Sequence, residues 1–424
     1  MATVTRVRRV RAGAAHWAHR RAGLVALAAV VGPGVLAGLS DDDPAGITTY
    51  SILGADFGYR LLWVLLLSTV ALVVFHELGA RMGVVTGRGL AALIRQRYGG
   101  RASVGAATLL LLANIGTMCA EFAGVAAASE LAGISRYVSV PLAAIAVSTL
   151  VVRGGFRRVE HVLLLLAVVF VAYFISGFLA HPHWGSAARG LVVPALPLRR
   201  HALLVATATV GTTLAPWGLA FIQSYAVDKK LRPAQLGLER IDVIVGAVMT
   251  GVIGLFVVVA CAATLHAHGR AINDAGDAAA ALRPLAGHLA STLFAVGLLG
   301  AALLAAAVLP LSTAYSVSEA FGRDAQIEAR IREEPLFYGS FALVVAAGAL
   351  VVLVPGAPLI PILFLTQAVN AVLLLPLLVF ITLLARDRSL LGEHASGRLG
   401  TAVTAAVTLM ITAATVALAV VTVD

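Results

Sequence analysis

Charge is scarce in this sequence. Only 12% of the 424 residues are charged, whereas 60% are hydrophobic. An average soluble domain has about 25% charged residues, so this composition excludes a single soluble domain. Cysteine is also rare: Cys119 and Cys261 both lie in apolar stretches, which supports neither a disulfide framework nor a thiolate metal site. The composition predicts an all-α polytopic membrane protein.

Eleven apolar segments are long enough to cross about 30 Å of hydrocarbon. The shortest of them is the fourth. They cover residues 23–53, 60–82, 104–132, 137–152, 160–180, 201–227, 241–266, 289–319, 338–355, 358–385 and 399–422. A basic segment, 1–22, precedes them. The first apolar run is too long for a signal peptide and has an acidic interruption, so we expect it to be retained as the first helix.

Basic residues are distributed unevenly between alternate loops. The net charge is +10, and with the N-terminus inside, the cytoplasmic segments hold 24 of the 31 Lys and Arg residues and the outer loops hold seven. This asymmetry predicts a cell-membrane protein with its N-terminus in the cytoplasm and its C-terminus outside. The positive charge therefore indicates topology and contact with an anionic lipid bilayer, and not nucleic-acid binding.

Two apolar segments are interrupted in the same way. The first contains S-D-D-D-P-A-G at 40–46 and the sixth contains G-T-T-L-A-P-W-G at 211–218, each with a Pro followed two residues later by a Gly. Proline breaks the helical hydrogen-bond ladder, and carboxylates inside a membrane are costly. Both are tolerated where the chain lines a cavity, which the three aspartates would make suitable for a cation.

The two breaks divide the chain into halves. Each would open a five-helix repeat, at 23–180 and 201–385, and together these repeats would form a transporter core over 23–385. The segment at 399–422 adds an eleventh helix outside the repeat. Paired interrupted helices are typical of inverted-repeat transporters, whose substrate lies near the bilayer midplane between the two breaks.

Asp43 is the main candidate for a cation ligand because it immediately precedes Pro44. Carbonyl groups freed at the break, together with this carboxylate, would form an oxygen site suited to a hard cation. An alternative is that Asp41, Asp42 and Asp43 cap the second half-helix at a water interface. Asp41 and Asp42 could also enrich cations at the mouth of the path.

Several short motifs are distributed along nearly the whole chain. They are Gly32-Pro33-Gly34, Asp43-Pro44-Ala45-Gly46, Phe57 to Ser68, Ala80 to Gly87, Ala120 to Gly124, Glu160, Gly190 to Pro194 and Thr366-Gln367. Together they strongly resemble the NRAMP family of divalent metal-ion transporters. This resemblance implies a LeuT-like fold with helices 1 and 6 broken.

Three positions depart from the family pattern. Gly46 replaces the metal-binding Asn of the first helix, and Ala215 and Trp217 replace the metal-binding Met and the His of the sixth. Loss of the thioether disfavours softer ions, and a roomy oxygen site suits Mg²⁺, which retains several waters. The chain resembles a magnesium-specialised branch more than the main branch. We expect Mg²⁺, and Mn²⁺ second, as substrates and no bound cofactor.

The resemblance also implies further ligands. Thr212 falls where the family uses a backbone carbonyl, and Gln367 where an amide approaches the metal. Thr213 could act beside Thr212, and Asn370, one helical turn after Gln367, could face the same way. Alternatively, these polar groups only bridge helices.

Proton coupling is expected to be weak or absent. The resemblance implies that protons pass through a His in the sixth helix and an acidic pair in the third segment. In this sequence the His position is Trp217, and the acidic pair is reduced to Glu121 because its other position is Met118. Neither Trp nor Met can carry protons. Glu121 could still titrate, or could bind Arg or backbone groups.

His76-Glu77 begins a His-Glu-x-x-His protease pattern that fails at Ala80, so we expect no enzyme activity. Glu77 could serve the cation path or pair with His76 or Arg81. The prediction is thus a monomeric Mg²⁺ transporter that works by alternating access. Alternatives are a proton-coupled Mn²⁺ or Fe²⁺ importer, a transporter of small organic cations, a non-transporting sensor or scaffold, and an intramembrane protease.

Overall fold

The computed structural model describes residues 37–38, 40–152, 171–197, 199–283, 287–323 and 331–423, and these residues form helices and loops. The basic segment 1–22, the Gly32-Pro33-Gly34 motif and Glu160 lie outside this part of the chain. The long and half-length helices are α3 (Pro44–Phe57), α4 (Leu62–Thr86), α6 (Gly100–Leu131), α7 (Arg136–Val152), α11 (Arg200–Thr213), α12 (Pro216–Asp228), α13 (Leu236–Thr264), α16 (Ala290–Ala320), α17 (Pro335–Val352), α18 (Leu359–Ala385) and α20 (Arg398–Val423).

Eight helical stretches among the described residues are long and apolar enough to cross a membrane. They are α4, α6, α11 with α12, α13, α16, α17, α18 and α20. Helix α7 is apolar but shorter, α3 is the part of the first predicted span that follows its break, and α9 (Val171–Leu179) ends the fifth. Each predicted span that lies within the described residues thus corresponds to a helix, which confirms a polytopic membrane protein.

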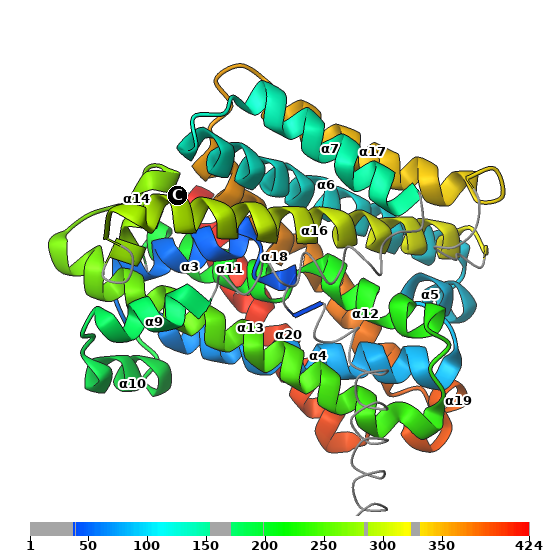
Figure 1. The fold of residues 1–424 in the computed structure, drawn as a ribbon. Coiled ribbons are helices and arrows are strands. Elements are labelled where there is room, and N and C mark those ends of the chain that lie inside the picture. Colours follow the sequence, from blue (N-terminus) through cyan, green and yellow to red (C-terminus); the bar gives the residue numbers. More distant parts are fainter. Residues whose placement is uncertain are drawn as a thin grey trace, which may run out of the picture.

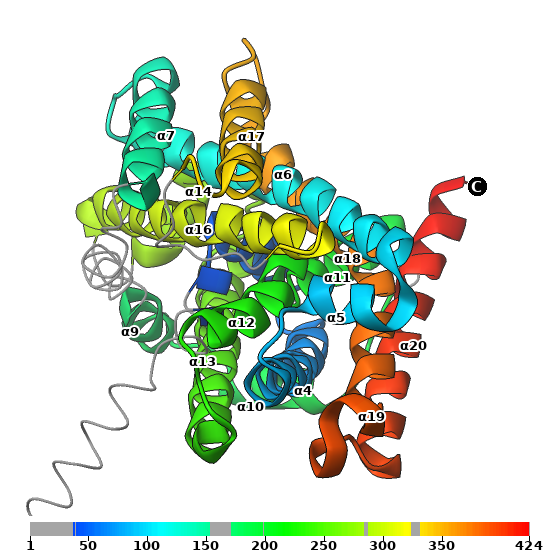
Figure 2. The same cartoon turned by 90° about the vertical axis from the view of Figure 1, so that its right-hand side faces the viewer.

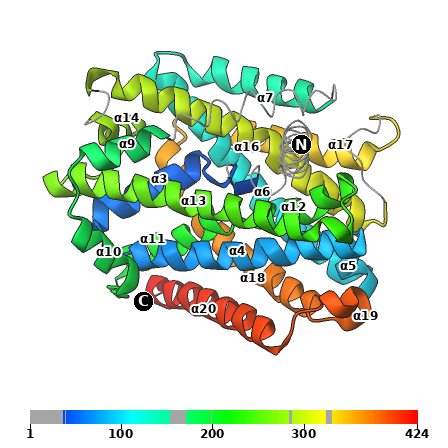
Figure 3. The ribbon, with the colours of Figure 1, turned by 60° about the horizontal axis from the view of Figure 1, so that its bottom comes forward.

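The helices form layers around the two interrupted spans. Figure 1 shows α3 and α11 in the middle, with α16, α6, α7 and α17 on one side and α13 and α4 on the other. In Figure 2, α12 lies across α4 and α13. Helix α20 lies at the edge of the molecule beside α18 and α4 in Figure 3, and only 22% of its most apolar stretch is buried. The broken spans therefore lie in the interior.

Both predicted breaks are present. The chain bends at Asp42 and Asp43 before α3 begins at Pro44, and α11 ends at Thr213 before α12 begins at Pro216. Proline is suited to the first helical position, where its missing N–H would have had no partner. Each break therefore also starts a new helix.

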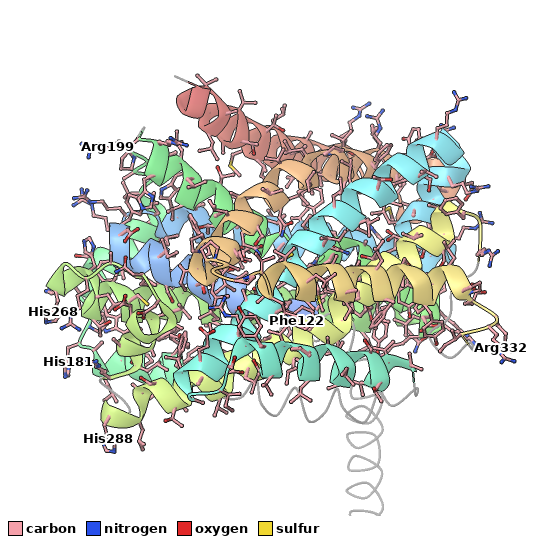
Figure 4. All side chains as sticks on the ribbon, turned by 90° about the horizontal axis from the view of Figure 1, so that it is seen from above. Phe122, His181, Arg199, His268, His288 and Arg332 are labelled. Carbon is pink, nitrogen blue, oxygen red and sulfur yellow. The ribbon has the colours of Figure 1, made fainter. Side chains whose placement is uncertain are left out.

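The loops contain more structure than the sequence predicted. The basic loop after α4 forms α5 (Leu90–Tyr98), and α10 (Trp184–Val192), α14 (Ala275–Ala279) and α19 (Arg388–Leu391) lie in other connections. Figure 4 labels Arg199 and Arg332 at opposite ends of the molecule. Their loops thus alternate between the two sides, whereas the absolute orientation stays a prediction.

Candidate functional site

Asp43 caps the helix that follows the first break. Its Oδ1 accepts a hydrogen bond from the backbone N–H of Gly46 at 2.6 Å, and the residue has the extended backbone of an N-cap. The capping alternative is therefore correct for Asp43, but its water-interface part is wrong, because Asp41, Asp42 and Asp43 are 1%, 0% and 3% exposed. Asp41 and Asp42 accordingly lie inside the protein and not at a water-filled mouth.

Gly46 has three oxygen atoms close to the position that a side chain would take, here called the Gly46 space. A β-carbon at this position would lie 2.9 Å from the carbonyl oxygen of Asp41, 3.3 Å from Oδ1 of Asp43 and 3.4 Å from Oγ1 of Thr212. The Thr212 hydroxyl has no hydrogen-bond partner among the described residues. The two breaks thus bring together Asp43, Gly46 and Thr212 as predicted, and they add the Asp41 carbonyl.

Glu121 reaches the same place from α6. Its carboxyl group interacts with that of Asp43. No backbone or side-chain N–H, and no Ser, Thr or Tyr hydroxyl, of the described residues donates a hydrogen bond to Glu121. Gly124 makes this approach possible, because a β-carbon there would collide with the ring of Pro44. The alternative that Glu121 binds Arg or backbone groups is therefore wrong for the described residues. Figure 4 labels its neighbour Phe122 near the middle of the molecule.

The region around the first break holds several carboxyl groups without a basic partner among the described residues. Four buried carboxyl groups gather here, from Asp41, Asp42, Asp43 and Glu121, and none of them forms a salt bridge with a described residue. No Lys or Arg side chain in the described ranges is fully buried. Because a buried charge without a partner is strongly unfavourable, this arrangement requires a cation or protons.

Gln367 lies beside the second break, but its side chain is engaged elsewhere. Its amide bonds to Thr366 and Asn370 in its own helix. Asn370 also donates to Thr117 of α6 at 2.8 Å, and Thr213 bonds to the hydroxyl of Tyr50 at 3.0 Å. Bridging between helices is therefore confirmed for Asn370 and Thr213.

Gly211 sets the distance between α11 and α18, because a β-carbon there would overlap the backbone carbonyl of Gln367. We expect Gly211→Ala to destabilise the protein by about 1–3 kcal/mol, the usual effect of overpacking. Gly116→Ala in α6 is the matched control, since its β-carbon would lie at an ordinary contact distance of 3.8 Å from Thr366 of α18. Thermal unfolding in detergent measures the difference. Equal midpoints for the two variants would contradict this role of Gly211.

The positions without the expected ligands are closely packed. Ala215 is the N-cap residue of α12 and lies with the fully buried Trp217 and Met118 in one apolar cluster. Met118 packs against Gly348 of α17, where a β-carbon would be 2.6 Å from its Cγ. The indole of Trp217 neighbours Phe221, with ring centroids 6.2 Å apart. At the positions where the family pattern has metal-binding or proton-carrying residues, this chain therefore has apolar packing.

Glu77 is already neutralised by two arginines. Its carboxylate binds Arg81 at 3.5 Å and Arg240 at 2.8 Å. The predicted pairing with Arg81 is therefore confirmed, and the pair with Arg240 is an addition that the sequence did not indicate. These two contacts account for its partial burial without a role in the cation path.

Sequence reasoning missed His76. Its side chain is fully buried, and neither ring nitrogen has a hydrogen-bond partner among the described residues. Oδ1 of Asp41 and Nε2 of His76 lie 3.3 and 3.4 Å from the point where Gly218 would carry a β-carbon. An ionisable residue within a membrane span is the signal that could have identified it.

A large polar cavity lies at the far end of α12, about 18 Å along the helix from Pro216. Its volume is about 690 Å³, and its lining includes both basic and acidic residues. Among them are Arg88, Arg95, Ser224, Asp228, Lys230 and Glu319. It lies on the side where the sequence places the cytoplasmic loops.

The oxygen set around Gly46 can bind a hard divalent cation. A carboxylate, a hydroxyl and a backbone carbonyl are oxygen donors that Mg²⁺, Ca²⁺ and Mn²⁺ accept. No thioether or imidazole group faces Gly46 among its nearest contacts. The arrangement is that of a partly hydrated cation site.

Sequence comparison identifies related proteins. A family model described as "Natural resistance-associated macrophage protein-like" (Nramp) matches residues 34–421. The divalent metal cation transporter MntH of Burkholderia ambifaria is 33% identical over 292 residues, which cover 66% of this chain and 66% of that protein. MntH of Ralstonia nicotianae is 34% identical over 285 residues, with 64% of each covered. The matched region thus spans slightly less than two thirds of these relatives.

Structural comparison gives the same fold. A crystal structure of the Eremococcus coleocola manganese transporter with an aromatic bis-isothiourea compound has a TM-score of 0.75 at 19% identity, covering 92% of this chain and 85% of that one. Mhp1, a nucleobase-cation-symport-1 family transporter, has a TM-score of 0.59 at 15% identity, with coverages of 92% and 90%. At these identities the likeness shows the fold alone, and it confirms the LeuT-like expectation.

Proposed function

Because the chain belongs to the natural resistance-associated macrophage protein-like family, we propose that it carries divalent cations across a cell membrane, with Mg²⁺ as the main substrate and Mn²⁺ as a second. The observation that carries this proposal is the space at Gly46. There, oxygens of Asp41, Asp43 and Thr212 lie within 3.4 Å of one point in a region of buried, uncompensated carboxylates. A transported cation supplies the missing positive charge.

The donor set supports the preference for Mg²⁺. The atoms around Gly46 are oxygens, and the position of the missing thioether is Ala215, whose small side chain leaves α12 without a soft ligand. Transition-metal ions gain more than Mg²⁺ from thioether and imidazole ligands. A site without them gives up this advantage and keeps the oxygen donors that Mg²⁺ prefers.

The same region supports transport with little or no proton coupling. Trp217 and Met118 pack in an apolar cluster and cannot take up protons. In this proposal Mg²⁺ moves down its electrochemical gradient. The spans that contain the breaks rock against the remaining helices. The ion then leaves through the polar cavity beside Arg88 and Lys230. In this orientation the N-terminus lies in the cytoplasm and the C-terminus outside.

Uptake into liposomes tests this function. The reconstituted full-length protein is supplied with Mg²⁺, Mn²⁺ or Ca²⁺ while the internal pH is recorded. We expect Mg²⁺ uptake without acidification, and slower Mn²⁺ uptake. Mn²⁺ uptake accompanied by acidification, with Mg²⁺ excluded, would instead identify a proton-coupled transition-metal importer.

Restoring the soft ligand should change selectivity. We expect Ala215→Met to increase the ratio of Mn²⁺ to Mg²⁺ uptake by about tenfold, which corresponds to about 1.4 kcal/mol in relative ion affinity. Methionine is flexible enough to fit beside Trp217. Ala215→Leu adds similar bulk without sulfur and is the matched control. An equal change in both variants would show that volume, not the thioether, sets the selectivity.

A further inference from the structure

We propose that Asp41 and His76 form a second divalent-cation site, on the other side of the first break from the Gly46 space, and that this site favours Mn²⁺ over Mg²⁺. This inference rests on the proposed transport function and assigns a second ion to the same region. It starts from the feature that the two breaks share, a Pro followed two residues later by a Gly.

Each of these glycines has polar atoms close to the position that a side chain would take. At Gly46 the nearest atoms are the Asp41 carbonyl, Asp43 Oδ1 and Thr212 Oγ1. At Gly218 they are Oδ1 of Asp41 at 3.3 Å, Nε2 of His76 at 3.4 Å and Oδ2 of Asp41 at 3.8 Å from the point where a β-carbon would lie. Asp41 therefore faces the first space with its backbone and the second with its carboxylate.

His76 is held in this position by the packing of α4 against α12. Two glycines of α4 allow this close packing, because a β-carbon at Gly79 would lie 3.0 Å from Cγ2 of Ile222 and one at Gly83 would lie 2.6 Å from the Gln223 carbonyl oxygen. His76 lies one turn before Gly79, beside the first turn of α12. Its ring has no other hydrogen-bond partner among the described residues, so Nε2 is available to a ligand at Gly218.

The carboxyl groups of Asp41 and Asp42 also favour a second ion. Asp43 and Glu121 interact with each other, so a single ion at Asp43 serves this pair. The carboxyl oxygens of Asp41 and Asp42 accept no hydrogen bond from the described residues. A second cation between Asp41 and His76 would give the Asp41 carboxylate the partner that it lacks.

The ligand types set the expected preference. One carboxylate and one imidazole leave the remaining coordination positions to water, in keeping with the absence of any cluster of three His, Cys, Asp or Glu ligands among the described residues. Imidazole binds Mn²⁺ and later transition metals better than Mg²⁺. The second site is therefore chemically distinct from the oxygen site at Gly46.

Mn²⁺ titration of the purified full-length protein, followed by electron paramagnetic resonance, tests this proposal. We expect two Mn²⁺ per chain in the wild type, one in Gly218→Ala, which fills the space, and one in His76→Leu. Gly237→Ala is the matched control, since its β-carbon would meet no atom within 4 Å, and it should retain two. An excess of Mg²⁺ should displace one Mn²⁺ and leave the one whose spectrum shows nitrogen coupling from imidazole.

The outcomes separate this proposal from the transport function. One Mn²⁺ per chain, unchanged in Gly218→Ala and His76→Leu and lost in Asp43→Ala, would overturn the second site and leave the first intact. Two Mn²⁺ in the wild type without imidazole coupling would also overturn it. No bound Mn²⁺ in the wild type would overturn the second site, and Mg²⁺ uptake into liposomes then decides the transport function separately. If Gly218→Ala fails to fold, His76→Leu and the nitrogen coupling decide the question.

Discussion

Replacing Asp43 by alanine is expected to reduce Mg²⁺ and Mn²⁺ uptake into liposomes by more than about 100-fold. Loss of a mere outer-shell partner of a metal ligand typically costs 10–100-fold, and Asp43 is a charged group directly at the proposed site. Its Oδ1 lies 3.3 Å from the centre of the Gly46 space. The same change removes the hydrogen bond to the Gly46 N–H, so some loss of stability accompanies it.

An aspartate within α3 itself provides the control. Asp56 lies near the other end of the helix and pairs with His201 at 2.7 Å, away from the breaks. Asp56→Asn should therefore leave uptake within about twofold of wild type, since an exposed pair contributes little. Asp43→Asn keeps an oxygen for the Gly46 N–H and removes the charge. Wild-type uptake in Asp43→Asn would show that the carboxylate charge is not needed and would contradict the proposed site.

Replacing Gly46 by alanine is expected to weaken Mg²⁺ binding by at least about tenfold. The added methyl group would lie 2.9 Å from the Asp41 carbonyl and between Asp43 and Thr212, in the space assigned to the ion. Alanine keeps the backbone N–H that donates to Oδ1 of Asp43, and it favours helix by about 1 kcal/mol relative to glycine. The substitution thus removes the space without removing a ligand.

Binding of Mg²⁺ to the purified protein, measured by calorimetry, tests this expectation. Gly105→Ala in α6 is the control, since a β-carbon there meets no atom within 4 Å, and it should bind as wild type does. Tighter or unchanged binding in Gly46→Ala would place the ion elsewhere. For the same steric reason, introducing Asn at Gly46 is a poor way to restore a transition-metal site, and Ala215→Met alone is the better test.

Residue patterns were sufficient to predict the general architecture. Long apolar runs cross a membrane only as helices, and proline cannot continue the hydrogen-bond ladder, so the spans and both breaks could be located without coordinates. The importance of Asp43 followed from its place before Pro44. Short helices such as α5 and α10 escaped prediction, because they are brief, lie in polar connections and depend on tertiary contacts more than on local preference.

Only the tertiary structure decided which polar groups meet. Glu121 joins Asp43 because Gly124 lets α6 approach Pro44, and His76 faces Asp41 across Gly218. Glu77, next to His76 in the chain, instead points to two arginines.

The physical reason is that helix composition and breaks are local properties, whereas side-chain contacts between distant segments depend on helix rotation and on close backbone approach at individual glycines. By itself, the sequence determined a membrane protein with two interrupted helices and an acidic first break. The packing of α4, α6 and α12 around that break decided that its carboxylates lie buried without a basic partner among the described residues, beside a free imidazole.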